Sequence, residues 1–516
     1  MNTKRITGWL VAAVLYGMAA ITLAEPIRLD SCGEVCPGHV ISGKERIHVC
    51  SGTHNIILDG VKVELSDQEG ACAFLMEDDT RVFLTLKNRN DLESGSGCAG
   101  IQVPSGAELI VTVDSTGSLH AKGGREGAGI GGGSGQDAGT IRILGGKIWA
   151  IGGKNSRGSG AGIGGGFRGS FDEILISGGI VKATGMSGGA GIGGGCTGKG
   201  SLITITGGVV DAEADVSDFI SGAGIGGGAN RSSGTIVIEG GIVSARTMYY
   251  DGKPTGAGIG GGENDGCDSI TIRGGMIIAG AGSTGAGIGA SSNGAVGEIV
   301  IDGGFVRAGG GAWGGVGIGG EYSYLQMRGV IEINGGTVVA KGGSTERFNP
   351  GAAGIGGSVN HQSPEIVITG GYVQANGGEG GYLAGAGIGS SGGMSANRID
   401  ISGGSIVANA GGDEETVYGG AGIGGGGLGL ARRIVIWGGR ITANGSGRSA
   451  GIGDGERSSP SVWISGGDVT ANGGEGYDGI TGVLAQAGGN VVSSCRTLEP
   501  NAMEDDNWPR RTDDDE

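Results

Sequence analysis

Hydrophobic and polar positions alternate in short runs along most of the chain, which is the pattern of β-strands. One run is Ile-x-Ile before a Gly-Gly pair, as at Ile141 and Ile143. A second is Val-x-Ala after such a pair, as at Val181 and Ala183, and a third is Ala-Gly-Ile, as at residues 128–130. We therefore expect three short strands per unit, each with two residues pointing toward one core.

The three runs recur in the same order, and each unit carries one Gly-Ile-Gly. The eleven central isoleucines are Ile130, Ile163, Ile192, Ile225, Ile259, Ile288, Ile318, Ile355, Ile388, Ile423 and Ile452. Helical repeats of similar length need long helix-forming stretches, whereas glycine interrupts these units throughout. We predict an all-β fold, a right-handed parallel β-helix (β-solenoid) with three short strands per coil and about eleven Gly-rich coils preceded by N-terminal coils.

Equivalent positions hold the same residue in successive coils. Ile stands two residues before the Gly-Gly pair in every coil, and the third strand ends on Ala. Stacked identical side chains fill a core in which each coil contacts only its neighbours. Directly after that Ala, four coils carry Asn376, Asn409, Asn444 and Asn472. We expect these side chains to form a structural ladder of hydrogen bonds, in preference to a ligand site.

Glycine flanks every isoleucine of the first strand, as at Gly129 and Gly131, although glycine weakens a strand. Two explanations remain open at this point. The first is a tight corner whose φ values only glycine tolerates. The second is a face without side chains that another surface can approach closely.

Composition and the first residues suggest a secreted repeat protein. The chain has 128 Gly and only 9 Pro, without the Gly-X-Y period of collagen. Lys4 and Arg5 precede an apolar run over residues 9–23, and Thr22 and Ala24 suit a signal-peptide cleavage site. An uncleaved signal anchor is the alternative. No other stretch is long and apolar enough to span a membrane, so we expect no membrane span in the mature chain.

Four regions follow from these patterns. We expect a signal peptide over residues 1–24, an N-terminal cap with further coils over 25–125, the eleven-repeat β-solenoid over 126–475, and a C-terminal cap with an acidic tail over 476–516. The net charge of −17 disfavours nucleic acid as a partner, because binding to phosphates requires basic patches.

The eight cysteines suggest disulfide bonds in an oxidising compartment. Five of them lie in the first quarter of the chain, in a spacing that fits no zinc motif. Cys72 and Cys98 occupy equivalent positions one coil apart, within disulfide reach, and are our first pairing. Cys196 and Cys267 fall at different repeat positions, so we do not expect them to pair.

Little in the sequence indicates catalysis. The Gly-rich segments lack the Gly-Lys-Ser/Thr ending of a phosphate-binding loop. A polysaccharide lyase is the enzymatic alternative, because that chemistry is often housed on parallel β-helices. It uses carboxylates for calcium and a basic residue for proton abstraction. The acidic residues considered for this role, which form no compact set with a basic partner, are Asp211, Asp215, Asp302 and Asp400.

Outward-facing aromatic residues are the main signal for sugar binding, because a flat ring can stack on a pyranose. Trp437 and Trp463 fall on adjacent coils, two residues apart along the strand, within reach of a diagonal contact. Trp149 points outward from the third strand of the first Gly-rich coil. We take all three as candidate carbohydrate-binding residues; the alternative is that they cover local apolar surface or an end cap.

Two sets of motifs resemble known families. The unit Gly-Ala-Gly-Ile-Gly-Gly-Gly joined to Ile-x-Ile-x-Gly-Gly-x-Val-x-Ala resembles repeats of large secreted and cell-surface bacterial proteins. The segment from Asn55 to Gly60, through residues 84–87, to residues 98–104 is similar to the start of a carbohydrate-binding β-helix family related in fold to pectate lyases. This resemblance implies binding of plant-type polysaccharide and makes calcium the cofactor to test, although no acidic cluster offers a calcium site to carry over.

The working hypothesis is a secreted or cell-surface, non-catalytic β-solenoid whose partner is a polysaccharide or another extracellular surface. The rival from another class is a structural or adhesive rod without glycan specificity. The third hypothesis of function is a polysaccharide lyase.

Overall fold

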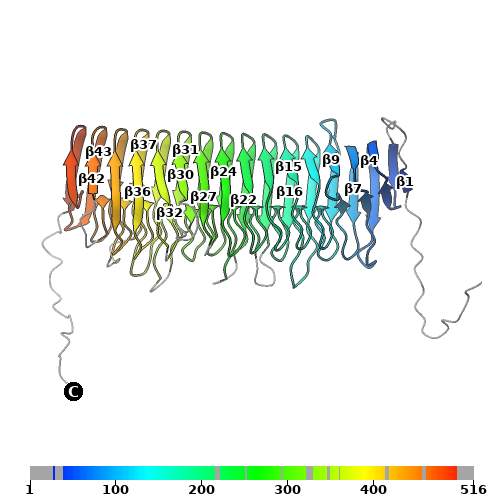
Figure 1. The fold of residues 1–516 in the computed structure, drawn as a ribbon, viewed down its shortest axis with the longest axis horizontal. Helices are drawn as coiled ribbons and strands as arrows, with labels where there is room; N and C mark the ends of the chain where they lie inside the picture. The colour runs from blue at the N-terminus through cyan, green and yellow to red at the C-terminus, as the bar shows by residue number, and fades with distance from the viewer. Residues whose placement is uncertain are drawn as a thin grey trace, which may run out of the picture.

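The computed structural model describes residues 27–29, 39–215, 221–249, 253–291, 294–320, 329–345, 349–359, 361–412, 416, 418–455 and 461–496. The expected signal peptide and acidic tail lie outside the described residues. The coils stack side by side along one long axis and make a rod, from β1 at one end to β45 at the other (Figure 1). Every pairing between these named strands is parallel, as a β-solenoid requires.

Three parallel sheets, A, B and C, run along the rod. Sheet A contains β1 (Ile27–Leu29), β3 (Ile47–Val49), β5 (Phe74–Met76), β8 (Ile101–Gln102), β11 (Ile130–Gly131), β14 (Ile163–Gly164), β17 (Ile192–Gly193), β20 (Ile225–Gly226), β23 (Ile259–Gly260), β26 (Ile288–Gly289), β29 (Ile318–Gly320), β32 (Ile355–Gly357), β35 (Ile388–Gly389), β38 (Ile423–Gly424) and β41 (Ile452–Gly453). Sheet B contains β2 (His39–Gly43), the first part of β4 (Gly52–Glu64), β6 (Thr80–Lys87), β9 (Glu108–Val111), β12 (Thr140–Ile143), β15 (Glu173–Ile176), β18 (Leu202–Ile205), β21 (Thr235–Ile238), β24 (Cys267–Ile272), β27 (Val296–Ile301), β30 (Val330–Ile333), β33 (Glu365–Ile368), β36 (Ala396–Ile401), β39 (Ala431–Ile436), β42 (Ser461–Ile464) and β44 (Val483–Gln486). Sheet C contains the end of β4, β7 (Arg89–Glu93), β10 (Ser118–Lys122), β13 (Lys147–Ile151), β16 (Ile180–Gly185), β19 (Val209–Ala214), β22 (Ile242–Thr247), β25 (Met276–Gly280), β28 (Phe305–Gly309), β31 (Thr337–Lys341), β34 (Tyr372–Asn376), β37 (Ser405–Asn409), β40 (Arg440–Asn444), β43 (Asp468–Glu475) and β45 (Asn490–Arg496).

The repeated apolar residues fill the space between the three sheets. In the register of neighbouring coils, Ile130 lies beside Ile163, Ile141 beside Ile174, and Ala150 beside Ala183. Such residues are buried in every coil and belong to one continuous core. The predicted fold class, an all-β parallel β-solenoid with three strands per coil and eleven Gly-Ile-Gly coils, is confirmed.

The first strand differs from the expectation of two inward residues. Sheet A strands such as β11 contain only an isoleucine and a glycine, and the preceding alanine lies outside the main core. Ala257, Ala286, Val316 and Ala353, which hold this alanine position, form a separate buried cluster. The reason is local: the N–H of Ala128 donates to the carbonyl oxygen of Gly132 across the two-residue strand, so the chain turns away on both sides.

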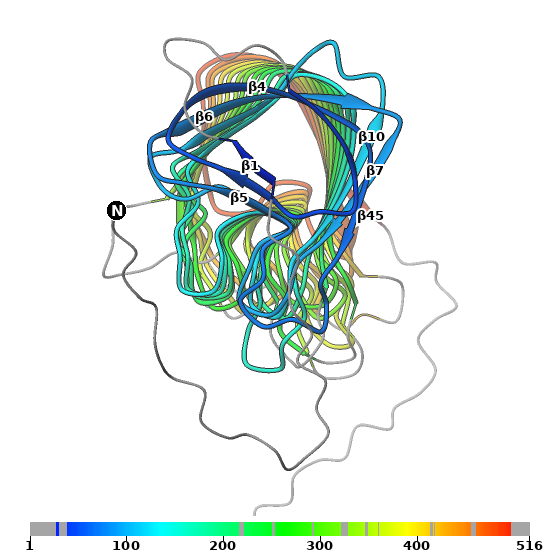
Figure 2. The same cartoon turned by 90° about the vertical axis from the view of Figure 1, so that its right-hand side faces the viewer.

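Loops cover the outer side of sheet A. In the view along the rod they stack below β1 and β5, while β4 and β10 lie on the opposite side of the core (Figure 2). Sheets B and C are therefore the exposed faces of the solenoid. Outward side chains on these two sheets face solvent along the rod.

The flanking glycines are explained by backbone geometry inside the molecule. The second glycine has a positive φ in each Gly-rich coil, for example 136° at Gly131 and 130° at Gly164, which confirms the tight-corner interpretation. The first glycine is crowded, because a Cβ on Gly129 would lie 2.6 Å from the carbonyl oxygen of Gly162 in the next coil. Both glycines are buried. The surface that approaches them closely is the next coil of the same chain.

The predicted disulfide and the predicted ladder are both present. Cys72 and Cys98 form a disulfide between adjacent coils, with their Cα atoms 5.3 Å apart. Each asparagine of the ladder donates from Nδ2 to Oδ1 of the preceding one, at 2.8 Å from Asn409 to Asn376, 2.7 Å from Asn444 to Asn409, and 2.8 Å from Asn472 to Asn444. These contacts tie coils together independently of the core.

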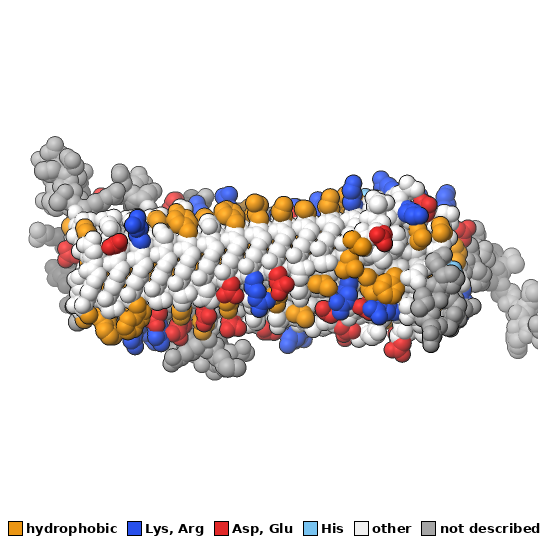
Figure 3. Space-filling view, turned by 90° about the horizontal axis from the view of Figure 1, so that it is seen from above, with side chains coloured by type: hydrophobic (Ala, Val, Ile, Leu, Met, Phe, Trp, Pro, Cys, Tyr) orange, Lys and Arg blue, Asp and Glu red, His pale blue; other side chains and the backbone are white. Residues whose placement is uncertain are grey.

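A band of stacked Gly-Gly turns runs along the corner between sheets B and C. In Figure 3 this band is the white strip, and a row of hydrophobic side chains follows one of its edges. The row lies on the sheet C side, one residue after each pair, and its exposed members are Ile180, Val209, Ile242, Met276, Phe305 and Tyr372. No helix in the described part of the chain is long and apolar enough to cross a membrane.

Candidate functional site

The outward side chains of sheet C form a groove near the N-terminal end. Strand alternation sends Leu92 and Ala121 into the core, so their neighbours point outward. The register then aligns two outward rows across four coils. The first row is Lys62, Asp91, His120 and Trp149, and the second is Glu64, Glu93, Lys122 and Ile151.

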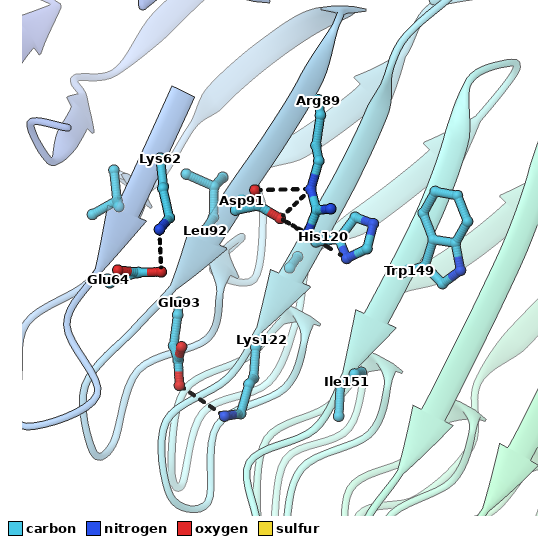
Figure 4. Close-up of a pocket in the computed structure, with 12 residues that line it drawn as sticks. Lys62, Glu64, Arg89, Asp91, Leu92, Glu93, His120, Lys122, Trp149 and Ile151 are labelled. Atoms are coloured by element: carbon cyan, nitrogen blue, oxygen red, sulfur yellow. Dashed lines mark hydrogen bonds and ion pairs between the residues drawn. The ribbon is translucent and has the colours of Figure 1, made fainter. Parts of the chain in front are cut away.

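These rows line a groove of about 270 Å³ (Figure 4). Its further lining residues are Val63, Arg89, Leu92 and Ala121. One end carries charged groups and the other carries the rings of His120 and Trp149. The groove is therefore amphipathic, which is the usual character of a site for a small polar ligand with apolar faces.

Opposite charges in the groove occur in pairs. Lys62 Nζ lies 2.8 Å from Glu64 Oε1, and Lys122 Nζ lies 2.7 Å from Glu93 Oε1. Arg89 Nε donates to both carboxylate oxygens of Asp91 at 3.0 Å. The net charge of these three pairs is zero.

Two cations of these pairs, Lys62 and Arg89, stay charged at neutral pH. The hydrogen bond to Glu64 raises the pKa of the Lys62 ammonium, and the hydrogen bond to Asp91 raises the pKa of the Arg89 guanidinium. Such exposed pairs contribute little to stability. The donors and acceptors that the pairs leave unused are available to a ligand. Hydroxyl groups could donate to the carboxylates and accept from the cations.

Trp149 lies at the apolar end of the groove. Its ring stacks on the imidazole of His120, with centroids 4.6 Å apart and an angle of 30° between the planes. His120 Nδ1 is 3.9 Å from Asp91 Oδ1, which connects the stack to the charged end. The predicted outward position of Trp149 is confirmed, and the structure supplies a setting that Trp149 alone did not reveal.

Trp437 and Trp463 lie in contact on sheet B, toward the other end of the rod. Trp463 belongs to β42, and Trp437 follows β39 directly. Their ring centroids are 5.1 Å apart at an interplanar angle of 54°, and the residues are 49% and 39% exposed. The predicted diagonal contact is confirmed. Trp149, on sheet C of a distant coil, is not part of this pair.

The tryptophan pair also shields an apolar neighbour. Val435 lies beside Trp463 in register and two residues before Trp437, yet it is only 1% exposed. This burial agrees with the alternative interpretation, in which the rings cover local apolar surface, and the two tryptophan residues are still 49% and 39% exposed. One role does not exclude the other.

The acidic residues considered for a lyase are not brought together. Asp211 pairs with Arg246 at 2.6 Å, Asp302 accepts from Asn334 at 2.9 Å, and Asp400 pairs with Arg398. Among the described residues, three possible metal ligands lie close together: His48, Cys50 and Glu77. It contains one carboxylate, whereas calcium takes six to eight oxygen ligands.

Cys196 and Cys267 are buried and do not pair with each other, as predicted. Burial raises the pKa of the Cys196 thiol to about 11 and that of Cys267 to about 12. Both remain protonated at neutral pH. Neither has the low pKa of a reactive cysteine.

The sequence alone missed the groove around Trp149. His120, Asp91, Glu93 and Lys122 stand in coils without the Gly-Ile-Gly mark, so they were not aligned with the later coils. The signal was present in the shared inward positions, where Leu92, Ala121 and Ala150 lie level in the register. Alignment on those residues places the groove residues side by side.

Comparison with known families agrees with the coil architecture. Nine segments match the model of a family described as beta helix repeat, over residues 111–134, 141–167, 174–196, 203–229, 236–263, 331–359, 366–393, 434–456 and 462–482. No curated protein and no solved structure matches the chain. The similarity concerns the repeat and its fold, and it says nothing about a ligand.

Proposed function

We propose that this chain is a secreted, non-catalytic β-solenoid that binds polysaccharide through outward aromatic side chains. The observation that carries the proposal is the exposed contact pair Trp437 and Trp463. Two adjoining rings offer a broad apolar surface on which the C–H face of a sugar can stack. The rigid sheet beneath them holds that surface in place before binding, which lowers the entropy cost of binding.

The groove on sheet C supports the same class of ligand. The stacked rings of His120 and Trp149 give an apolar wall, and the ion pairs beside them give hydrogen-bond donors and acceptors. Sugars need both kinds of contact, because each ring has apolar faces and a rim of hydroxyl groups. A long polysaccharide chain that reached both sites would bind more tightly than at either one.

The test is retention of the full chain on insoluble and gel-immobilised polysaccharides, with and without calcium. The variants are the double substitution Trp437→Ala/Trp463→Ala and the groove substitution Trp149→Ala. Trp313→Ala is the matched control, because Trp313 is as exposed as Trp463, at 39%, and lies in a turn away from both sites. We expect a loss of at least about tenfold in affinity for the double variant and no change for the control.

Other outcomes would overturn the proposal. Equal retention of the double variant and of the control would show that the tryptophan pair is not part of the binding site. Unsaturated products in the incubation would indicate a lyase. No retention on any glycan would favour the structural or adhesive rod, for which the exposed apolar row beside the Gly-Gly band is the supporting observation.

A further inference from the structure

Three side chains with metal-binding atoms meet at the N-terminal end of sheet A. His48 lies in β3, Cys50 follows that strand, and Glu77 follows β5 in the next coil. One ligand atom from each lies within 4.8 Å of the other two. This cluster is separate from both aromatic sites, which lie on sheets B and C.

The backbone holds the cluster without help from a loop. The N–H of Cys50 donates to the carbonyl oxygen of Leu29 at 3.0 Å, and the N–H of Glu77 donates to that of Val49 at 2.9 Å. Both residues therefore continue the sheet A ladder by one position and lie level on adjacent coils. His48 is two residues before Cys50, so strand alternation favours the same side for both.

The carboxylate of Glu77 is oriented for a ligand. The backbone N–H of Ser51 donates to Oε2 at 3.2 Å, and the Ser51 hydroxyl lies 3.4 Å from the same oxygen. The other oxygen, Oε1, faces His48 Nε2 at 2.9 Å. Support of this kind orients a metal ligand from the outer shell.

The cluster is open to solvent. The side chains of His48 and Glu77 are 22% and 37% exposed, so an ion can enter from solvent.

We propose that His48 Nε2, Cys50 Sγ and a Glu77 oxygen form a zinc site. An imidazole, a thiolate and a carboxylate suit Zn²⁺, which binds such ligands in tetrahedral geometry at about 2.0–2.3 Å. On binding, the Cys50 thiol loses its proton to solvent and its sulfur bonds to the ion. The two negative ligands then balance the ion's charge, and a water completes the fourth position.

The site would join two coils close to the predicted N-terminal cap. His48 and Cys50 belong to the coil of β3 and Glu77 to the coil of β5, while the disulfide of Cys72 joins the coil of β5 to the next one. The ion and the disulfide would thus link three successive coils. Such links would strengthen the N-terminal end of the described solenoid, where the coil of β1 flanks the coil of β3.

Titration of the chelator-treated full chain with Co²⁺, followed by displacement with Zn²⁺, tests the site. We expect one equivalent of Co²⁺, an absorption band from sulfur-to-cobalt charge transfer, and release of about one proton per ion. Cys50→Ser should abolish the band, and His48→Ala and Glu77→Gln should each weaken binding at least about tenfold. Glu77→Gln keeps the size of an exposed side chain, so it separates loss of a ligand from loss of folding.

The controls are Cys495→Ser and His361→Ala, which change the same residue types elsewhere and should bind Co²⁺ as the parent does. The proposal is overturned by a chain that binds no Co²⁺, by a charge-transfer band that survives Cys50→Ser, or by equal affinities of the ligand and control variants. Mass spectrometry that finds Cys50 in a disulfide would overturn it as well.

Discussion

Glu263 is a carboxyl group that the fold buries away from the surface. It follows β23, and its Oε2 accepts a hydrogen bond from the N–H of Ser221 at 3.1 Å, while Oε1 accepts from Asn264 at 3.3 Å. Burial raises the pKa of Glu263 even though these two hydrogen bonds lower it. The charged form therefore costs stability in the folded state, and more so as the carboxyl becomes fully ionised.

Replacement of this group should stabilise the protein at neutral pH. Because the folded-state pKa of Glu263 lies above its unfolded value, protonation favours the folded state as pH falls through that folded value. We expect Glu263→Gln to raise the free energy of unfolding by about 1 kcal/mol at pH 7, and the gain to disappear below about pH 4.5. Thermal unfolding of both proteins across this pH range measures it. A gain that stays constant with pH would mean that the charge is not the cause.

The asparagine ladder shows how an element along the rod is stabilised. Asn409 and Asn444 each take part in two ladder hydrogen bonds, one to each neighbouring coil, and Ser494 extends the ladder by donating to Asn472 at 2.6 Å. Asn376 takes part in one, because its neighbour in the preceding coil is Lys341. The same side chain thus has a different number of partners at different places in one element.

The cost of losing a rung should follow its number of partners. We expect Asn409→Ala to lower the free energy of unfolding by about 1–2 kcal/mol and Asn376→Ala by about half as much. The reason is that each half-buried hydrogen bond between the side-chain amides contributes roughly 1 kcal/mol. Denaturant unfolding of the two variants gives the comparison. Equal costs for the interior and the end position would show that the ladder adds nothing beyond the packing of the individual side chains.

At the scale of elements, the strands could be predicted from sequence because the residue that points inward repeats. Ile141, Ala150 and their equivalents mark sheets B and C coil by coil, and the asparagine ladder follows from the same alignment. The loop layer over sheet A could not be predicted, because alternation does not show which outer face is covered. The first strand was also predicted to be longer than it is. The periodicity does not show the hydrogen bond from the N–H of Ala128 to the carbonyl oxygen of Gly132, which limits the strand.

The candidate sites were predictable only where they coincide with the repeat. Trp437 and Trp463 were found because both occupy positions defined by the Gly-Gly pair. The groove around Trp149 and the cluster around His48 combine residues of N-terminal coils, which lack a mark that aligns them. Only the three-dimensional register brings His48 and Glu77 to one place.

For the whole molecule, stacking of like coils makes the rod modular. The coil between Ile388 and Ile423 contacts its two neighbours through matching residues, with Ile399 between Ile366 and Ile434 in sheet B. Removal of this coil would place β33 beside β39 and β34 beside β40. Asn376 would then face Asn444, so the ladder would re-form with one rung fewer.

Deletion of residues 389–423 should therefore leave a folded and cooperative protein, because stability in such arrays is nearly a sum of coil and neighbour terms. We expect an unfolding temperature within about 5 °C of the parent and an unchanged shape of the far-ultraviolet circular dichroism spectrum. Deletion of residues 389–404 is the matched control: it removes β36 but keeps β37, so sheet B would lack a strand where sheet C retains one. That mismatch should lower the unfolding temperature by at least about 10 °C. An equal fall in the unfolding temperature for both deletions would mean that the rod folds as one indivisible unit. The register between coils would then matter less for stability than the length of the chain.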